Sequence, residues 1–272
     1  MSRTRSARSR STHVADYPFF DNGGRPIPFA HRGGALTGDH VGLENSMAAF
    51  EAAIAMGYRH IETDVHSTRD GAVVAFHDTT LDRITDRTGR LDGLDHADLA
   101  RALVGGREAI PLLSDILTAW PELRLNIDAK ADAAVVPLAR CIDQHHAWDR
   151  VCVASFSPRR LHQLRKVLDS RVATAYSAFG VGALRLLPSR RLRGWAVHHG
   201  QAAQVPPRRG PLEVVTTAFV ERAHDLGKQV HVWTIDDAGT MQRLLDLGVD
   251  AIMSDRIDVL REVFESRGIW QA

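Results

Sequence analysis

The feature that most constrains the fold of this chain is a repeated order of elements, in which an amphipathic helix pattern ends at a glycine and a short apolar strand follows. The stretches AMGYRHIETD, DLGKQVHVWTID and DLGVDAIMSD share this order, and each strand runs to an acidic residue. Glycine has no Cβ and suits the left-handed conformation that ends many helices, as expected for Gly57, Gly227 and Gly248. Each stretch is therefore predicted to be a helix-to-strand joint.

Extending this pattern along the chain predicts strands that alternate with helices. Strands are expected near residues 27–30, 59–65, 123–128, 150–155, 171–176, 194–198, 229–234 and 250–253. Helices are expected at residues 46–56, 132–146, 157–169, 217–226, 237–247 and 256–267. Such alternation favours a parallel sheet with right-handed crossovers, and this number of strands favours closure, so the predicted fold is an α/β TIM (β/α)8 barrel.

Two segments interrupt the alternation. Residues 66–115 contain a predicted strand pair around Asp70 and Gly71 and then a polar, turn-rich loop, which indicates a small inserted cap after the second strand. Residues 199–213 are also turn-rich and are expected to form a loop, at most with a short strand. Neither segment is expected to be a separate domain, so residues 25–272 are predicted to form a single one.

Charge and composition narrow the class of protein. The chain has 272 residues, 44% of them hydrophobic, and a formal net charge of +1, which is typical of a globular protein without a global field for nucleic acid. No apolar run reaches the roughly 18 residues of a membrane-spanning helix, so no stable membrane insertion is expected. Residues 1–24, which begin MSRTRSARSRST, are predicted to be a disordered basic tail. Cys141 and Cys152 are expected to be buried thiols, which favours the reducing cytoplasm.

Acidic side chains are expected to gather at one rim of the barrel. Residues two apart on a strand share a face, so Glu62, Asp64 and His66 point together, and so do Asn126, Asp128 and Lys130. Parallel strands end at the same rim, where these groups converge. A divalent cation held by Glu62, Asp64 and Asp128 is one interpretation, with Mg²⁺ and Ca²⁺ both suited to oxygen ligands. The alternative is that Glu62 and Asp64 pair with an arginine or a lysine.

Histidines and cations are predicted at the same rim. His31 follows the first strand and His77 closes AVVAFHD, so both are candidates for exchanging protons during a reaction. Arg32, followed by Gly33 and Gly34, places a guanidinium and two unhindered backbone N–H groups there, which suits a phosphate. Lys130, on the same face as Asp128, adds a point charge. This set indicates displacement at phosphorus.

The motifs that carry these residues resemble the glycerophosphodiester phosphodiesterase family. They are HRGG, LENSMAAFEAAIAMGYRHIETDVHSTRDGAVVAFHDTTLDRITDRTG, LNIDAK, VHVWTIDD and GVDAIMSD, and the resemblance extends from about residue 27 to residue 265. It implies a TIM barrel with a small insertion and metal-dependent hydrolysis of glycerophosphodiesters to sn-glycerol 3-phosphate and an alcohol. It also implies that Glu62, Asp64 and Asp128 bind a divalent metal and that His31 and His77 carry out acid–base catalysis. Arg32 and Lys130 would contact the phosphate, and Glu44 and Asn45 would support the site. Trp233 would form an apolar wall for the glycerol.

The chain departs from the usual motifs of this family in several places. Asp128 stands where the family commonly has Glu, Ser46 stands where it has Thr, and SDRI at residues 254–257 stands where it has Thr-Asp-x-Pro. A carboxylate one methylene shorter still binds a hard cation but shifts it by about an ångström or recruits a water, which leaves the metal open. Asp236 and Asp255, also near strand ends, are expected to face helix N-termini.

Two other functions are weighed against this hydrolase. A lysophospholipase D-like enzyme would meet lipid through the 66–115 cap and the arginine tail, and it would need an amphipathic helix with exposed apolar residues in that cap, which the sequence does not show. A non-catalytic phosphate-binding barrel would share the carboxylates and the arginine but has no use for both His31 and His77. We therefore expect an enzyme whose partner is a small glycerophosphodiester, not a nucleic acid.

Overall fold

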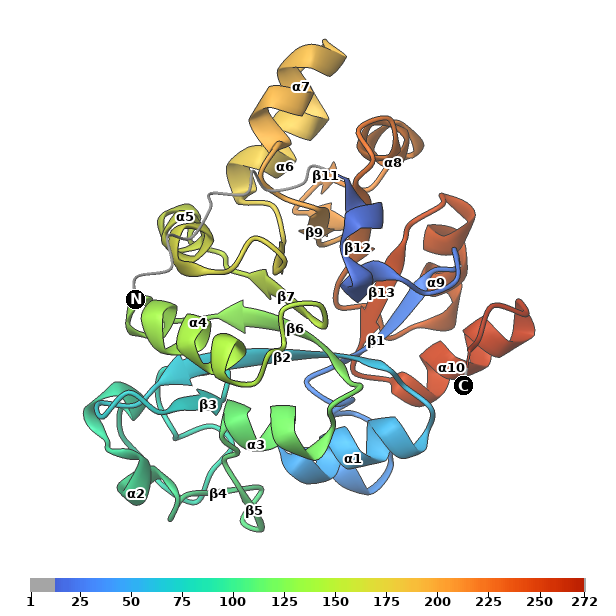
Figure 1. Ribbon diagram of the computed structural model, residues 1–272. Helices are drawn as coiled ribbons and strands as arrows, with labels where there is room; N and C mark the ends of the chain where they lie inside the picture. Colours follow the sequence, from blue (N-terminus) through green and yellow to red (C-terminus); the bar gives the residue numbers. More distant parts are fainter. Residues whose placement is uncertain (1–12, 272) are drawn as a thin grey trace.

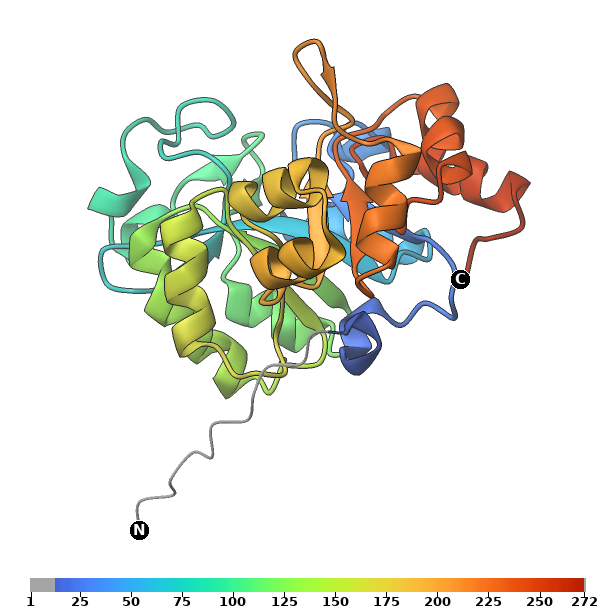
Figure 2. The same ribbon diagram turned by 90° about the horizontal axis from the view of Figure 1, so that it is seen from above.

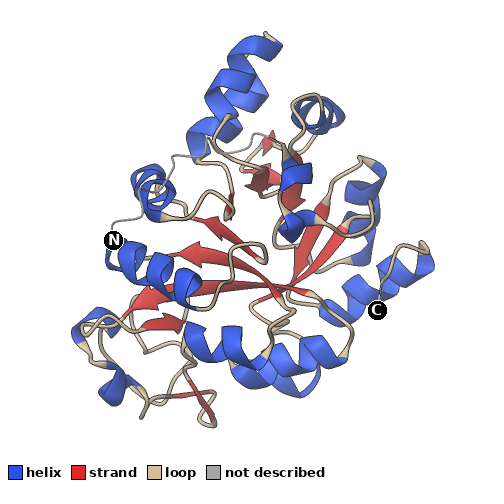
Figure 3. Cartoon of the chain, viewed as in Figure 1, coloured by secondary structure: helices blue, strands red, loops and turns tan. Residues whose placement is uncertain are grey.

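Eight parallel strands form a nearly closed barrel, surrounded by helices (Figure 1, Figure 3). The computed structural model describes residues 13–271. The strands lie in the order β8-β7-β6-β2-β1-β13-β12-β9, and a parallel bridge between Ala175 and Ala202 links the β8 and β9 sides. The predicted TIM barrel is therefore confirmed.

Each barrel strand is followed along the chain by at least one helix that packs outside the barrel. The strands are β1 (Ile27–His31), β2 (His60–Ser67), β6 (Arg124–Ala129), β7 (Val151–Ala154), β8 (Ala173–Thr174), β9 (Ala202–Val205), β12 (Gln229–Val232) and β13 (Ala251–Ser254). The helices are α1 (Met47–Ala55), α3 (Leu113–Ala119), α4 (Val135–Gln144), α5 (Pro158–Val167), α6 (Ala178–Leu186), α7 (Arg190–Val197), α8 (Thr217–His224), α9 (Ala238–Asp246) and α10 (Ile257–Ser266). Among residues 13–271, no helix is long and apolar enough to cross a bilayer.

The segment between β8 and β9 differs from the prediction. Residues 194–198, expected to form a strand, lie mostly in α7, whose first turn is capped by the Ser189 hydroxyl accepting from the Leu192 N–H. The Arg193 side chain is buried and donates to two carbonyls, those of Leu187 and Pro188, which favours the helical turn over an extended strand. The barrel strand β9 instead lies in the segment expected to be a loop.

The inserted cap after β2 has a small core of its own. The predicted strand pair is present, since β3 (Val73–Ala75) pairs antiparallel with β2. The cap continues through α2 (His96–Leu99) and the short pair β4 (Leu103–Val104) and β5 (Glu108–Ala109). Its buried apolar residues form a separate cluster: Leu43, Val74, Phe76, Leu81, Leu91, Leu99, Ala102, Val104 and Ile110. Helix α3 begins at Leu113, inside the segment predicted to belong to the cap.

The opposite end of the barrel is closed by aromatic residues that precede β1. Tyr17, Phe19 and Phe20, in and between the 3-10 helices Val14–Asp16 and Pro18–Phe20, are buried. The predicted tail boundary at residue 24 is therefore wrong for residues 13–24, because these rings cover the barrel floor, on the side away from the cap (Figure 2). Residues 1–12, the rest of the predicted tail, lie outside the described residues.

Two glycines after β1 bring the first rim loop into close contact with the helices around it. Gly33 and Gly34 have φ values of +84° and +86°, which side chains other than glycine rarely adopt. A Cβ on Gly33 would lie 2.8 Å from the Ala49 Cβ, and one on Gly34 would lie 2.6 Å from Ile257 Cδ1. The RGG sequence is thus required by packing against α1 and α10, and this packing fixes the loop that carries Arg32.

A buried histidine in the barrel floor predicts acid sensitivity. Burial lowers the pKa of His231 to about 4, against about 6.5 in an unfolded chain. The unfolded state therefore binds the extra proton first, so the stability that neutral His231 contributes is complete above pH 6.5 and is lost as the pH falls toward 4. The free energy of unfolding should fall by about 1.4 kcal/mol per pH unit for this proton.

Urea unfolding between pH 4 and pH 7 measures this slope. The variant His231→Leu should show a shallower pH dependence than the wild type by about one proton. His60, whose pKa burial lowers to about 3, adds a proton of the same sign in both proteins and serves as the internal reference. Identical slopes for the two proteins would contradict the assignment.

Candidate active site

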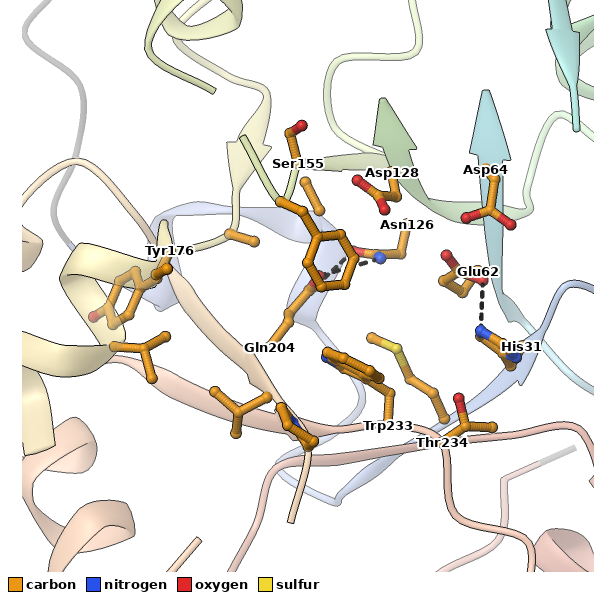
Figure 4. Close-up of a pocket in the computed structure, with 18 of the residues that line it drawn as sticks. His31, Glu62, Asp64, Asn126, Asp128, Ser155, Tyr176, Gln204, Trp233 and Thr234 are labelled. Carbon is orange, nitrogen blue, oxygen red and sulfur yellow. Dashed lines mark hydrogen bonds and ion pairs between the residues drawn. The ribbon is translucent and has the colours of Figure 1, made fainter. Parts of the chain in front are cut away.

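The acidic residues of β2 and β6 lie side by side at the carboxyl end of the barrel strands. Strand register places Asp64 opposite Asp128 and Glu62 opposite Asn126. All three carboxylates are buried and line one cavity, as Figure 4 shows. The structure thus brings together the residues that the sequence suggested as metal ligands.

Two basic side chains lie between these carboxylates. Lys130 Nζ is 2.7 Å from Asp64 Oδ1 and 2.7 Å from Asp128 Oδ2. Arg32 Nε lies 3.0 Å from Asp64 Oδ2, although without hydrogen-bond geometry. Asp64 therefore forms ion pairs with a lysine and an arginine, which is the alternative that the sequence left open. Within residues 13–271, no three His, Cys, Asp or Glu side chains are arranged so that they could hold a metal ion.

The neighbours of Glu62 and Asp128 only partly compensate the negative charge of these two carboxylates, so burial favours the neutral form of each. Burial and the charge of Asp64 raise the pKa of Glu62 to about 7. Burial also raises the pKa of Asp128 despite Lys130, and Asp128 Oδ1 is buried without a hydrogen-bond partner in the described part of the chain. For Asp64, the charges of Lys130 and Arg32 outweigh burial and lower the pKa. The donor set, oxygen atoms only, is of the type that a hard divalent cation prefers, but the side chains must rearrange around Lys130 before they can hold one.

His31 is held by an acid from the last barrel strand. Its Nδ1 lies 2.8 Å from Asp255 Oδ1, and its Nε2 lies 3.6 Å from Glu62 Oε2. Burial lowers the pKa of His31, but Glu62 and Asp255 outweigh it and raise the pKa overall. The expectation that Asp255 faces a helix N-terminus is wrong for its side chain. Asp236 takes that place, because its Oδ1 accepts from the N–H groups of Asp255 and Arg256.

His77 belongs to a second network, which the cap completes. Its Nδ1 lies 2.6 Å from Asp78 Oδ1, and Arg83 of the cap donates from Nε to Asp78 Oδ2 at 2.6 Å. Burial would raise the pKa of Asp78, but the hydrogen bonds from Arg83 and His77 outweigh it and lower the pKa to about 2. Arg83 also donates to both oxygens of Glu44, at 2.6 and 2.9 Å. Asp78 therefore stays ionised and orients the imidazole.

The loops after β1 and before α1 meet around Arg32 and Asn45. Both residues adopt positive φ, +51° and +60°, and the Asn45 N–H donates to the Arg32 carbonyl. Asn45 Nδ2 donates to Asp64 Oδ2 at 3.1 Å, and Arg32 Nη1 donates to Glu44 Oε1 at 3.0 Å. The side chains of Arg32, Glu44 and Asn45 thus converge on the carboxylate cluster.

The glycine N–H groups that the sequence offered to a phosphate are already used. The Gly33 N–H donates to the Ala30 carbonyl, and the Gly34 N–H donates to the His31 carbonyl at 2.8 Å. That part of the phosphate hypothesis is wrong, because the tight turn consumes both donors. Arg32 and Lys130 face the cavity beside the carboxylates, and Arg209 also lines the cavity.

The cavity has a volume of about 650 Å³ and two ends of different character. Figure 4 shows His31, Glu62, Asp64 and Asp128 at one end and Tyr176 at the other. Trp233 lies between the ends, with its ring 5.5 Å from that of Phe156 in a T-shaped contact. The far wall includes apolar side chains from several elements, among them Phe156, Tyr176, Val181, Pro206, Val214 and Trp233. The cavity thus offers charged groups beside an apolar surface.

Residues 31–259 match the family model for the glycerophosphoryl diester phosphodiesterase family. The chain belongs to this family. Its members hydrolyse phosphoric diesters, and the resemblance seen in the motifs is confirmed. Over 262 residues, the chain of this phosphodiesterase is 40% identical to a probable glycerophosphodiester phosphodiesterase 2 of Mycobacterium tuberculosis, covering 92% of this chain and 98% of that protein.

Solved structures of this family show the same fold as this phosphodiesterase. A putative glycerophosphoryl diester phosphodiesterase of Silicibacter pomeroyi matches with a TM-score of 0.79 and 20% identity, covering 94% of this chain and 100% of that one. A phosphodiesterase of Oleispira antarctica, in complex with the product sn-glycerol-3-phosphate, matches with a TM-score of 0.70 and 23% identity, covering 89% and 97% of the two chains.

Several residues of this phosphodiesterase site were not found from the sequence. Asp255 was visible only as an acid after a strand, and its contact with His31 depends on β1 and β13 pairing across the chain ends. The amides of Asn126 and Gln204 are joined across the cavity at 2.6 Å. Asn126 gave no signal beyond the shared face of β6, and Gln204 lies on β9, in a segment that was expected to be mainly loop. Arg83 lies in the polar cap loop, where an arginine is usually a solvated residue.

Replacing Asp255 tests whether it positions His31. Asp255→Asn keeps the shape but removes the charge that orients the imidazole, so kcat should fall roughly 100-fold while KM for a glycerophosphodiester changes little. Steady-state kinetics on the purified variants measures both constants. Asp237→Asn is the matched control, because Asp237 caps α9 through the Thr240 N–H and asparagine caps equally well. A loss confined to KM, or an equal loss in the control, would contradict the role.

Proposed function

We propose that this phosphodiesterase hydrolyses small glycerophosphodiesters to sn-glycerol 3-phosphate and an alcohol, with His31 and His77 as the general acid–base pair. The observation that carries the proposal is that both imidazoles, three carboxylates, Arg32 and Lys130 line one cavity. A binding protein needs the cations alone, whereas two oriented imidazoles serve proton transfer. The names of the relatives agree with this reaction.

The two histidines are supported as proton carriers by their carboxylate partners. Asp255 holds Nδ1 of His31, and Asp78 holds Nδ1 of His77, so in each ring Nε2 is the atom left to exchange a proton with the substrate. One imidazole takes a proton from the attacking water, whose oxygen bonds to phosphorus, and the other donates a proton to the oxygen of the departing alcohol. The bond from phosphorus to that oxygen breaks as the new bond to phosphorus forms.

Arg32 and Lys130 are proposed to bind the phosphate. Both side chains face the cavity, and both already lie against Asp64. A guanidinium and an ammonium stabilise charge on the phosphoryl oxygens as it grows in the transition state. Glu44 and Asn45 are proposed to support the site by holding Arg32 and Asp64, through the hydrogen bonds at 3.0 and 3.1 Å.

Glu62, Asp64 and Asp128 are proposed to hold a divalent metal, Mg²⁺ or Ca²⁺. The oxygen-only donor set and the unpartnered Asp128 Oδ1 support this proposal. Lys130 lies between Asp64 and Asp128, so its ammonium must shift from at least one of them when a cation enters. When bound, the metal supplies positive charge next to the phosphoryl oxygens.

The surface of the cap favours a water-soluble diester over a lysophospholipid. Trp233 and Phe156 form an apolar wall that fits the glycerol backbone, as proposed for Trp233. Among the described residues, none of the large apolar side chains that are exposed belongs to the 66–115 cap, where a lysophospholipase D was expected to carry them. Cys141 and Cys152 are both free and buried, which supports the cytoplasmic location that we propose.

Alanine at either histidine tests the acid–base pair. His31→Ala and His77→Ala should each lower kcat by at least roughly 100-fold, because each removes one of the two proposed proton carriers. Product release from glycerophosphocholine measures turnover, and circular dichroism checks the fold. His162→Ala, at an exposed position of α5 away from the cavity, should keep wild-type activity. Near-wild-type kcat in either cavity variant would remove that histidine from the reaction.

Direct binding tests the metal proposal without relying on turnover. Calorimetric titration of the chelator-stripped protein with Mg²⁺ or Ca²⁺ should show a single site, and Asp128→Asn should weaken it at least tenfold. The exposed Asp98→Asn of the cap should bind as the wild type does. Stripped protein that shows no heat of binding and keeps its full activity would overturn the metal role.

A further inference from the structure

The segment that runs from just before β8 to the first residue of β11 (Leu212–Glu213) has an unusual charge composition, with acids only at its borders, where Asp169 pairs with Arg171 and Glu213 follows Leu212. Residues 170–212 contain seven arginines and no Asp or Glu, although the whole chain has a net charge of only +1. In the described part of the chain, none of the arginines between residues 185 and 209 forms an ion pair with a carboxylate. This region therefore carries uncompensated positive charge.

The same segment exposes several of its large apolar side chains to solvent. Helices α6 and α7 stand out from the ring of helices around the barrel (Figure 1). Leu186 and Trp195 have 79% and 71% of their surface exposed, and Phe179 and Leu192 are exposed as well. Isolated exposed apolar residues are common, but several on one pair of short helices mark an interaction surface.

Helix geometry places these residues on shared faces. On α6, Phe179 and Leu186 are seven residues apart and lie on one face. On α7, Leu192 and Trp195 are three residues apart, and Arg191 is four residues before Trp195, so the three form one stripe. A face with a tryptophan, leucines and arginines is typical of helices that lie at a membrane surface.

The β10–β11 hairpin extends this face toward the cavity. It consists of β10 (Arg208–Arg209) and β11 (Leu212–Glu213), and Leu212 is exposed at its turn. Arg185 at the end of α6 donates to the Glu213 carbonyl at 3.3 Å, so the helix end and the hairpin lie side by side. Val181 of α6 and Arg209 of the hairpin also line the cavity. The exposed face and the wall of the cavity thus share elements.

We propose that α6, α7 and the β10–β11 hairpin dock this phosphodiesterase onto an anionic lipid surface. The arginines supply charge complementary to phosphate headgroups, and Phe179, Leu186, Leu192 and Trp195 enter the interfacial layer. Docking of this kind is peripheral, in keeping with helices of nine and eight residues. The proposal does not depend on the reaction, because vesicle binding is measured without turnover.

Cosedimentation of the full chain with lipid vesicles tests this docking. Wild-type protein should bind vesicles of equal parts phosphatidylglycerol and phosphatidylcholine, bind pure phosphatidylcholine at least tenfold more weakly, and dissociate at high salt. The double variants Leu192→Ala/Trp195→Ala and Arg190→Gln/Arg191→Gln should each weaken binding to the anionic vesicles at least tenfold. None of these four residues lines the cavity, so turnover of glycerophosphocholine should stay at the wild-type level and show that the variants are folded.

Matched variants elsewhere on the surface test whether vesicle binding depends on this face or on the overall charge and hydrophobicity of the protein. Val136→Ala, at an exposed position of α4, and Arg87→Gln/Arg101→Gln, in the cap, should bind vesicles as the wild type does. Replacing Arg3, Arg5, Arg8 and Arg10 with Gln tests the N-terminal segment. Binding that survives Leu192→Ala/Trp195→Ala but disappears in the N-terminal variant would overturn the proposal, as would wild-type protein that does not bind anionic vesicles.

Discussion

Two buried carboxylates held side by side set the electrostatic conditions for the whole rim of this barrel. The parallel register of β2 and β6 places Asp64 opposite Asp128, and both are almost completely buried. Like charges at this distance cannot both stay ionised unless cations lie among them. Lys130 supplies one cation from the end of β6, and Arg32 supplies another from the loop after β1. The backbone conformation of the loop after β1 and of the end of β6 is therefore the one that places the Arg32 guanidinium and the Lys130 ammonium beside Asp64.

The loop that delivers Arg32 is strained, and its surroundings stabilise the strain. Arg32 and Asn45 both have positive φ, which costs about 1–2 kcal/mol for a residue other than glycine. Backbone hydrogen bonds from Arg32 N to the Glu62 carbonyl and from Asn45 N to the Arg32 carbonyl offset part of this cost. Gly33 and Gly34 permit α1 and α10 to pack directly against the turn. Strained residues in a well-packed loop are typical of preorganised sites.

Local periodicity predicted the parts of the site that lie on single strands, and it failed where distant segments meet. The period of two along β2 and β6 was enough to bring Glu62, Asp64 and Asp128 to one rim, because parallel strands share their direction. The contact of Asp255 with His31 requires the first and last strands to pair, which no local pattern reports. The strand prediction for residues 194–198 was wrong for another reason. A short apolar run is compatible with either a strand or a helix, and the buried Arg193 at its start favours the helix.

The two ends of the cavity constrain how a diester must lie in it. If His31 and His77 act as the proposed acid–base pair, the phosphorus lies at the end of the cavity that holds the carboxylates, because proton transfer needs hydrogen-bond reach. Under that proposal, one ester arm of the substrate would extend along Trp233 and Phe156 toward the part of the cavity lined by Val181, Arg209 and Val214. Val181 and Arg209 belong to the arginine-rich segment that is proposed to meet lipid. The two proposals therefore place the outer arm of the substrate and the lipid-facing surface on the same side of the barrel.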